Sequence, residues 1–578
     1  MHTFFVGLLF DSSAIAYTYS VFILLSILPF KFRNSKGYQN VLYVFYFLSS
    51  LIAIVLSSID FKFSQYTGKR SGIELFTVVG DEGNDVSSYF VSFWYLGVVM
   101  LFLLYLTCRF YPKLKGEYKT SLVKEIVVFL LVGGLTALGA RGGLGLKPIK
   151  SFAAAKYVDS ELVQLCINTP FNVISTLEGD VIEELNFVSE EESYAIVKPF
   201  KRYNGNGTKK PNVVILILES FGREYIGHLG GEKASTPFLD SLSKQFDCTS
   251  HPNFYSNGNV SMDAVPSILS GIPNWMDVSF SNSIYQTNGV ENIGSALGQM
   301  GYESRFYHGS NNGTMGFQNF LKMGGLNNYN GLDEYPTKDK DFDGHWGIFD
   351  EPYLQYIAKE MKQGKKPFFS TVFTLSSHHP YSIPKHLKGQ FRAYEDKISK
   401  SVAYTDYAVK QFFKSIQDEP WFENTVFFIT ADHTSFSKIK YYNQPPGRYE
   451  VPLMVYSPGD SIALNTTQAS HIDLLPSILG LVNYQDSFYS IGKSFFRLRD
   501  QSHLILYSNG LYWIKDRANN NWLTMRKDGA FNSYFTMKKG STKKNYKEFD
   551  ERGGYLLKEL QAYLQRFTND VIQNRMKN

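Results

Sequence analysis

The sequence is poor in cysteine. Its 578 residues include three, Cys108, Cys166 and Cys248. That number excludes a disulfide framework, and the spacing excludes a CxxC zinc pattern. Cys166 and Cys248 could pair if their domain lies outside the cytoplasm, and the sequence alone leaves this open.

Charge is scarce as well. Charged residues make up 19% of the chain and the formal net charge is +5. Dense basic patches beside stacking aromatic residues are absent, so we expect no nucleic-acid partner. The aromatic fraction is high, at 16%, which suits membrane spans and a strand-rich domain. A chain of this length is too long for one ordinary hydrophobic core, so we expect two or more domains.

Residues 1–141 contain apolar runs that approach the ~20 residues of a membrane-spanning helix. The runs lie at about 14–30, 41–58, 86–108 and 122–140. Charges are nearly absent inside the runs and crowd between them, which argues against a buried soluble helix bundle. We therefore predict a transmembrane helical domain of about four spans.

Loop charge predicts the orientation of these spans. Basic residues fill the first loop and the third loop, Arg109–Lys119, whereas the second loop, about 59–85, is longer and net acidic. The first and third loops then face the cytoplasm, and everything after Arg141 lies outside. The same pattern puts Met1 outside without a signal peptide. Because Phe4–Phe10 looks like the stub of an apolar segment, we expect one N-terminal span to be missing.

Residues 142–210 form a predicted connector. Gly142 and its neighbouring glycines end the fourth apolar helix. The stretch Ser151–Leu185 is amphipathic, as in a helix lying at the membrane surface, although ordinary helical packing explains it equally well. Lys201–Lys210 is polar and rich in Gly and Asn, which predicts a linker.

Residues 211–578 alternate between apolar runs and helical patterns. The runs, typical of strands buried on both faces, lie at about 212–218, 367–375, 424–430 and 451–457. The helical patterns lie at about 236–246, 290–299, 350–363 and 397–417. This alternation predicts an α/β domain with a largely parallel central sheet. A small β-rich appendage after residue 502 and a last helix at about 554–575 complete the predicted domain.

Polar side chains follow three of the predicted strands. Glu219 directly follows the first, the SSHH sequence that contains His378 and His379 follows the second, and Asp432 and His433 follow the third. Ligands of such sheets bind beyond the carboxyl ends of the strands. We therefore predict the chemistry at one edge of one sheet.

The stretch Asn253–Pro273 adds a hydroxyl group to this set. It passes through a Gly/Asn turn and places Ser261 at the start of a predicted helix. An isolated serine there would most simply cap the helix. Together with Glu219 and the Asp432–His433 pair, it suggests a metal-activated nucleophile.

Two carboxylates, a hydroxyl and an imidazole are plausible ligands for Mn²⁺, Mg²⁺ or Zn²⁺. A cation-bound serine hydroxyl loses its proton readily, and the same cation polarises a phosphoryl or sulfuryl oxygen. Arg448, His378 and His379 could contact anionic oxygens of the substrate or protonate a leaving group. Arg448 could equally be a surface residue, and His379, before a proline, could merely shape a turn.

Several motifs occur in a characteristic order: LES, TPFLDSL, NGNVSMDAVPSILSGIP, TLSSHHPY, TADHTS and YEVPLMVYSPG. Over nearly the whole chain, the pattern resembles the membrane-bound branch of the alkaline phosphatase/sulfatase superfamily. It is most similar to the lipoteichoic acid synthase-like phosphoglycerol transferases. Their relatives, the phosphoethanolamine transferases, share the plan of a helical membrane domain followed by an extracytoplasmic sulfatase-like domain.

The resemblance implies one divalent metal ion, with Mn²⁺ as the first choice and Mg²⁺ or Zn²⁺ as alternatives. The implied metal ligands are Glu219, Ser261, Asp432 and His433. Ser261 stands where the family usually has a nucleophilic Thr. His378 matches a substrate-contacting histidine. The implied substrate-binding set is His308, His378, His379 and Arg448.

The predicted function is transfer of a phosphoglycerol or phosphoethanolamine group through a covalent Ser261 intermediate. The donor would be phosphatidylglycerol or phosphatidylethanolamine, and the acceptor an envelope glycan or lipid. The protein would be a multi-pass cell-membrane protein with its catalytic domain outside. Sulfate-ester hydrolysis is not expected, because the sequence after Ser261 lacks the C/S-x-P-x-R signature of sulfatases. A phosphodiesterase or phosphatase, and a catalytically silent lipid-binding protein, are the alternatives.

The stretch after His308–Gly309 bears on what is transferred. Lipoteichoic acid synthases carry a Trp and an Arg there, and this chain offers Met315 and Phe317 instead. Neither can replace the paired hydrogen bonds of an Arg to a phosphate, although Lys322 or Arg305 could supply charge from another direction. We expect transfer of single groups, phosphoglycerol first, and no processive polymer synthesis.

Overall fold

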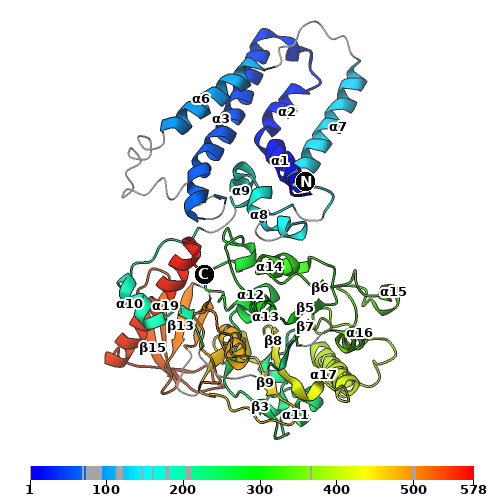
Figure 1. The fold of residues 1–578 in the computed structure, drawn as a ribbon, viewed down its shortest axis with the longest axis vertical. Helices are drawn as coiled ribbons and strands as arrows, with labels where there is room; N and C mark the ends of the chain where they lie inside the picture. Colours follow the sequence, from blue (N-terminus) through cyan, green and yellow to red (C-terminus); the bar gives the residue numbers. More distant parts are fainter. Residues whose placement is uncertain are drawn as a thin grey trace. The chain divides into compact units, whose positions relative to one another are not determined.

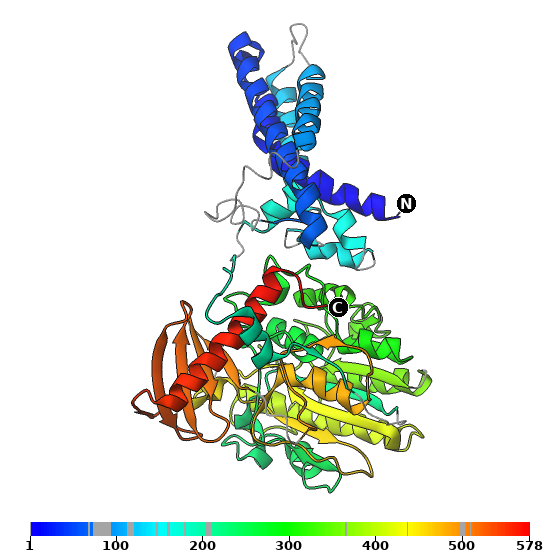
Figure 2. The same ribbon diagram turned by 60° about the vertical axis from the view of Figure 1, so that its left-hand side comes forward.

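The computed structural model describes residues 2–67, 70–72, 94–111, 121–145, 148–158, 162–177, 181–203, 210–364, 367–435, 437–497, 503–508 and 510–577. The chain divides into two units. The first unit contains Met1–Val181 and Asn282–Asn288, and the second contains Ile182–Ser281 and Gly289–Asn578. Each unit is described by itself (Figures 1 and 2).

The first unit consists of apolar helices. They are α1 (His2–Thr18), α2 (Ser20–Ser26), α3 (Lys36–Thr67), α6 (Trp94–Arg109) and α7 (Leu122–Arg141). Among the described residues, two helices, α3 over Lys36–Phe61 and α7, are long and apolar enough to cross a membrane, and the pair α1–α2 makes a third candidate if it counts as one span.

These helices modify the prediction of four spans. The predicted run 14–30 is not one straight helix, because α1 and α2 meet at an angle of 66°. The sequence Phe4–Phe10 lies inside α1. The described part of the run 86–108 is α6, with 16 residues. Most of the charges used for the orientation, including Lys115, lie outside the described residues.

The connector begins where the glycines predicted it. Helix α7 ends at Arg141, and Gly142 takes the left-handed conformation with a φ of 75°. The amphipathic stretch that follows forms three short helices, η2 (Ser151–Lys156), α8 (Val163–Cys166) and α9 (Thr169–Ser175). Phe171 of α9 packs edge-on against Phe10 of α1. Ordinary packing of short helices therefore describes this stretch better than a single helix lying at the membrane surface.

A seven-stranded sheet forms the centre of the second unit, in the order β3-β9-β8-β2-β7-β5-β6. The bounds are β3 (Cys248–Ser250), β9 (Leu453–Tyr456), β8 (Thr425–Ala431), β2 (Asn212–Leu218), β7 (Phe368–Phe373), β5 (Glu303–His308) and β6 (Tyr329–Asn330). The strands from β8 to β6 are parallel. Strand β9 runs antiparallel to β8 and to β3. The α/β class with a largely parallel sheet is confirmed, with a mixed edge at β9 and β3.

Helices cover this sheet in two groups (Figure 1). One group contains α11 (Pro237–Leu242), α16 (Asp350–Gln363) and α17 (Lys397–Ile416), and the other contains α12 (Ser261–Ser270), α13 (Ile293–Gln299) and α18 (Leu474–Leu481). Each of the four predicted helices is present. Strands β5 and β6 and helix α14 (Phe317–Met323) were not predicted.

The C-terminal part forms the predicted appendage. Its five-stranded antiparallel sheet contains β12 (Ile505–Ser508), β13 (Leu511–Lys515), β14 (Asn521–Arg526), β15 (Phe531–Met537) and β16 (Lys544–Tyr546). Helix α19 (Glu551–Ile572) crosses it (Figure 2). The predicted apolar face of α19 is buried, including Leu560 and Phe567. All three cysteines are free in the structure.

Candidate active site

Two neighbouring strands bring the predicted carboxylates together. Strands β2 and β8 are parallel, and their register pairs Leu218 with Ala431. Glu219 and Asp432 are the next residues on the two strands, so both carboxylates leave the same edge of the sheet. Both side chains are buried. The strand-end pattern read from the sequence thus produces a carboxylate pair by register alone.

Backbone groups fix the Asp432 carboxylate. The amide groups of Ser220 and His433 both donate to Asp432 Oδ1, each at 2.8 Å. The Ser220 hydroxyl donates to Glu219 Oε1, also at 2.8 Å. Ser220 is held in the left-handed region, with a φ of 60°, a costly conformation that tends to occur at functional sites. These contacts leave Asp432 Oδ2 and Glu219 Oε2 directed at other partners.

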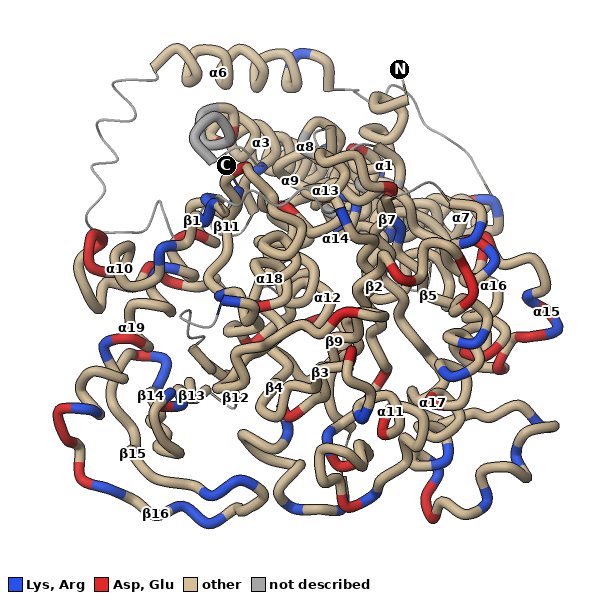
Figure 3. The backbone as a smooth tube through the Cα atoms, turned by 60° about the horizontal axis from the view of Figure 1, so that its bottom comes forward, with Lys and Arg blue, Asp and Glu red and all other residues tan. Residues whose placement is uncertain are grey.

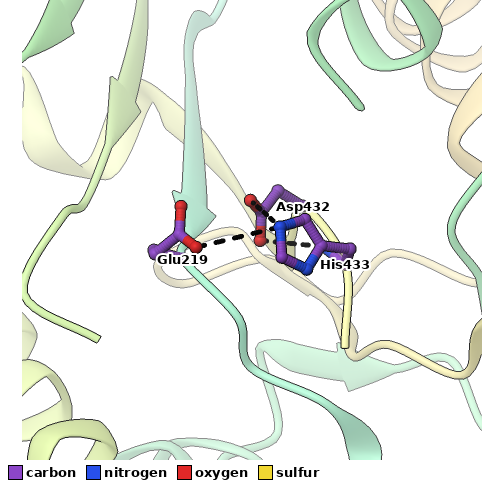
Figure 4. A group of neighbouring side chains, drawn as sticks. All are labelled: Glu219, Asp432 and His433. Atoms are coloured by element: carbon purple, nitrogen blue, oxygen red, sulfur yellow. Dashed lines mark hydrogen bonds and ion pairs between the residues drawn. The ribbon is translucent and has the colours of Figure 1, made fainter. Parts of the chain in front are cut away.

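His433 completes the group (Figure 4). Its Nε2 atom lies 3.1 Å from Asp432 Oδ2 and 3.8 Å from Glu219 Oε1. Its Nδ1 atom lies 2.8 Å from the carbonyl oxygen of Thr434. A carbonyl can only accept, so Nδ1 carries the hydrogen, and Nε2 of the neutral ring keeps its lone pair. This is how metal-ligating histidines are usually oriented.

The Ser261 hydroxyl joins these three side chains. Its Oγ atom donates to Asp432 Oδ2 at 2.8 Å and lies 3.3 Å from Glu219 Oε2 and 3.4 Å from His433 Nε2. Ser261 is the first residue of α12, and the N-cap is Val260. The capping interpretation is therefore wrong. The preceding turn needs Gly258, because a Cβ atom there would lie 2.0 Å from the Cβ of Asp263.

The electrostatics of this group fit a cation. Burial and the charge of Asp432 raise the pKa of Glu219 well above its usual range. Two buried carboxylates that repel each other are costly unless a positive charge lies between them. Glu219, Asp432 and His433 can each direct one ligand atom to a common point, with these atoms within 4.8 Å of one another. The donor set of oxygen and imidazole nitrogen suits Mn²⁺, Mg²⁺ or Zn²⁺.

His308 lies at the end of β5 and approaches the same edge of the sheet. Its Nδ1 atom faces the carbonyl oxygen of Phe373 at 3.4 Å. Its Nε2 atom is buried and has no hydrogen-bond partner among the described residues. Burial lowers the pKa of His308 to about 4, against the opposing charge of Asp432. A buried nitrogen without a partner, close to Asp432, is consistent with the predicted contact to substrate.

His378 follows β7 and is held by an unpredicted residue, Trp346. The two rings are 4.3 Å apart, and Trp346 Nε1 donates to the His379 carbonyl at 2.7 Å. His378 Nδ1 lies 2.9 Å from the same carbonyl, which leaves Nε2 available. The side chain of His379 is exposed. Trp346 is in turn fixed by Ser310, whose hydroxyl donates to its carbonyl oxygen at 2.7 Å.

Arg448 lies in the short helix η10 (Gly447–Tyr449), and its side chain is exposed. The Thr434 hydroxyl donates to the Arg448 carbonyl at 2.7 Å, so the backbone lies beside the His433 loop. In this structure the Arg448 side chain is that of a surface residue, which was the alternative interpretation. Contact of Arg448 with a substrate anion stays a prediction.

The candidate replacements for the family's Trp and Arg do not reach substrate in the same way. Phe317 is buried and packs edge-on against His308. The Arg305 guanidinium pairs with Glu303 and Glu360, at 2.6 and 3.2 Å. Arg305 is therefore not the missing cation. Trp346 supplies a tryptophan from another segment, and no local signal in its sequence marked it.

Residues 211–484 match the family model for Sulfatase. Lipoteichoic acid synthase 1 of Bacillus subtilis (strain 168) is 25% identical over 362 residues, which are 57% of this chain and 54% of that protein. Lipoteichoic acid synthase of Staphylococcus aureus (strain USA300) is 24% identical over 370 residues, which are 59% of this chain and 55% of that protein. The chain thus spans about half the length of the curated relatives it matches.

Two solved structures share the fold. A protein of the alkaline phosphatase superfamily from Vibrio parahaemolyticus superposes with a TM-score of 0.59 and 21% identity, over 68% of this chain and 99% of that chain. The lipoteichoic acid synthase LtaP of Listeria monocytogenes superposes with a TM-score of 0.53 and 16% identity, over 67% of this chain and 98% of that chain. The predicted sulfatase/alkaline phosphatase-like fold is therefore confirmed.

Proposed function

Because residues 211–484 form a sulfatase domain, we propose that the chain is a metal-dependent transferase that acts on phospholipids. It takes a phosphoglycerol group from phosphatidylglycerol and passes it to an envelope glycan or lipid. Phosphoethanolamine from phosphatidylethanolamine is the second choice. One observation carries the proposal: Ser261 Oγ lies within 3.4 Å of Glu219, Asp432 and His433 atoms. The similarity to lipoteichoic acid synthases supports a transferase of this general type.

The metal site would consist of Glu219, Asp432, His433 and Ser261, holding one divalent cation, with Mn²⁺ as the first choice. The fit rests on two oriented carboxylates and on the free Nε2 lone pair of His433. When bound, the cation lowers the pKa of the serine hydroxyl and polarises a phosphoryl oxygen. Asp432 keeps its orientation through the two amide groups that hold Oδ1.

In the first half-reaction, Ser261 Oγ attacks the phosphorus of the donor phosphodiester. The Oγ–P bond forms, the P–O bond to diacylglycerol breaks, and the serine proton passes to water. His378 gives a proton to the leaving diacylglycerol oxygen. Its Nδ1–H is fixed on a carbonyl, so Nε2 is the atom that exchanges protons.

The second half-reaction reverses these roles. A hydroxyl of the acceptor attacks the same phosphorus and gives its proton to His378. The Oγ–P bond breaks, and Ser261 recovers a proton from water. His308 would accept a hydrogen bond from a hydroxyl of the glycerol group through its unpartnered Nε2, and His379 and Arg448 would contact the outer part of the substrate.

We place the catalytic domain outside the cell membrane, on the evidence of loop charge. The test is a variant with cysteine at Lys115 in a background without the native cysteines. A membrane-impermeant thiol reagent should leave it unlabelled in intact cells. Labelling at this position would show the opposite orientation, with the catalytic domain inside the cell.

The reaction itself is tested with purified protein in detergent and labelled phosphatidylglycerol or phosphatidylethanolamine. Electrophoresis of the products should show one transferred group per acceptor. A regular ladder from phosphatidylglycerol would identify a polymerase and contradict single-group transfer. Release of free glycerophosphate, with no dependence on an added acceptor, would identify the hydrolase alternative.

A further inference from the structure

A large cavity lies beside the candidate active site in the second unit. Its volume is about 1280 Å³. It is formed by α15 (Lys338–Asp341), α16, the loop that follows His379, and the first turn of α17. Pockets for single small molecules usually measure ~300–1,000 Å³. The cavity therefore has room for something larger than one lipid headgroup.

Basic side chains line this cavity from four separate elements. Three belong to the loop, namely Lys385, Lys388 and Arg392. The others lie on α15, α16 and α17, namely Lys340, Lys359, Lys397 and Lys400. Figure 3 shows charged positions of this kind on α15 and beside α16 and α17. A cleft lined by one sign of charge concentrates ligands of the opposite sign.

These cations lack acidic partners. In the part of the chain that the structure describes, none of the seven forms an ion pair, whereas nearby Lys233 pairs with Asp396 at 2.6 Å. The cavity also contains three acidic residues, Asp341, Asp343 and Glu351, and two of them accept hydrogen bonds from other groups. Asp341 accepts from the hydroxyls of Tyr335 and Thr337, and Asp343 accepts from three backbone amides. Seven Lys and Arg side chains against three carboxylates leave the lining of the cavity with an excess of positive charge.

Aromatic rings add a second kind of surface. Tyr335 and Tyr356 lie edge to face at 5.4 Å, and Phe342 is 39% exposed. All three line the cavity. An aromatic face carries partial negative charge, which suits the polarised C–H groups of a sugar ring. Aromatic faces together with free cations favour a saccharide that carries several negative charges.

Tyr381 connects the cavity to the candidate active site. It lines the cavity, three residues after His378. Its backbone amide donates to the His378 carbonyl oxygen at 2.8 Å, so Tyr381 and His378 belong to the same turn. The Tyr381 backbone is in the left-handed region, with a φ of 67°. A ligand in the cavity would therefore extend toward the Ser261 site past Tyr381.

We propose that this cavity binds the acceptor, and that the acceptor is an anionic saccharide bearing several phosphate or carboxylate groups. The proposal rests on the transferase function proposed above and specifies its acceptor class. A phospholipid donor carries one phosphate, which does not account for seven cations on four elements. The donor's phosphate belongs at Ser261, and the acceptor's charges belong in the cavity.

Binding is tested without turnover, on the full-length Ser261→Ala protein in detergent. The probes are pentamannose 6-phosphate, hexagalacturonate and neutral maltohexaose. Both anionic probes, or one of them, should bind at least about tenfold more tightly than maltohexaose at low salt, and this advantage should shrink when the screening length falls. If the protein prefers one anionic probe, that preference shows whether the charged groups of the acceptor are phosphates or carboxylates. Equal affinity for all three probes would overturn the proposal.

Charge reversal locates the binding site. Lys385→Glu/Lys388→Glu should weaken binding of the anionic probe at least about tenfold, and Arg392→Glu is an independent second variant on the same rim. The matched control, Lys538→Glu/Lys543→Glu, changes the same charge at exposed positions outside the cavity and should bind within about twofold of the parent. Melting midpoints verify that each variant is folded. Unchanged affinity in both cavity variants would overturn the proposal.

Further outcomes distinguish this proposal from donor binding in the cavity and from failure of the proposed transferase function. If charge reversal weakens binding of dihexanoyl phosphatidylglycerol and not of the saccharides, the cavity holds the donor and the proposal is wrong. A Ser261 adduct without charge-dependent saccharide binding would contradict the proposal alone. Charge-dependent binding without any Ser261 adduct would contradict the proposed transferase and leave the cavity's ligand class standing.

Discussion

The ends of β2 and β8 differ from the loops that follow β5 and β7, although both lie at the same edge of the sheet. Glu219, Asp432 and His433, at the ends of β2 and β8, each place an atom within 3.4 Å of Ser261 Oγ on α12, and backbone groups orient Asp432 and His433. After β5 and β7, His308 keeps a nitrogen without a partner and His379 is exposed. The first region is organised by the chain itself.

The difference reflects two tasks, namely holding a cation and binding substrate. A group that holds a cation must be preorganised, because misplaced ligands lose affinity at once. A group that binds a departing and an arriving substrate must leave its polar atoms available. We therefore expect variants of the first region to lose the nucleophile or the metal, and variants of the second to change substrate binding, proton transfer and stability.

Ser261→Ala should give the largest effect on turnover. Loss of a nucleophile costs several orders of magnitude, about 10⁴-fold or more. Metal affinity should largely persist, because Glu219, Asp432 and His433 remain. Ser261→Thr is the matched control and should retain activity, since either hydroxyl can attack phosphorus. Steady-state rates and calorimetric Mn²⁺ titration measure the two effects. Near-normal turnover of Ser261→Ala would refute the covalent mechanism.

Asp432→Ala should lose both turnover and metal affinity, because it removes a charged ligand. Ser220→Ala should have a smaller effect, about tenfold in metal affinity, because it removes only the hydrogen bond that orients Glu219. Mn²⁺ titration of both variants measures the difference. If Ser220→Ala costs as much as Asp432→Ala, the distinction between ligand and orienting residue is wrong.

His308→Gln tests the second region through pH. Burial lowers the His308 pKa to about 4, below the ordinary value near 6.5. The unfolded chain therefore gains a proton first as the pH falls, and stability is lost between about pH 6.5 and 4. From pH 7 to 5 the parent should lose about 2 kcal/mol more than His308→Gln. Chemical unfolding with a chelator present measures this, and equal pH dependence would show that His308 is not buried in neutral form.

Trp346→Ala should give the smallest effect, a loss of about fivefold in kcat with little change in KM, since Trp346 positions the proton donor His378 and does not itself react. Trp346→Phe keeps the ring contact and loses the hydrogen bond, so it should lie between the parent and Trp346→Ala. Kinetics with phosphatidylglycerol measure the series. An effect confined to KM would mean that Trp346 serves substrate binding and does not position His378 for proton transfer.

The first region could be predicted from sequence because strand register created it. Two buried apolar runs ending in Glu219 and Asp432 become neighbours in any parallel pairing with this register. An apolar run does not reveal whether a strand near the edge of the sheet pairs parallel or antiparallel with its neighbour. Strand β9 runs antiparallel to β8. The bend between α1 and α2 has no proline or glycine to signal it.

The second region depends on contacts between distant segments. Trp346 reaches His378 because Asp343 accepts three backbone amides in a tight turn and Ser310 holds the Trp346 carbonyl. Nothing near position 346 in the sequence indicates this. The cations of the cavity come from four elements, so their convergence appears only when α15, α16 and α17 are in place.

The covalent step is tested most directly by mass spectrometry of the intact protein incubated with Mn²⁺ and phosphatidylglycerol or phosphatidylethanolamine. The account predicts an added mass equal to one phosphoglycerol group, located on the peptide that contains Ser261 and absent from Ser261→Ala. The same added mass on another residue, or diacylglycerol release without any adduct when turnover is stopped by rapid acid quench, would contradict it.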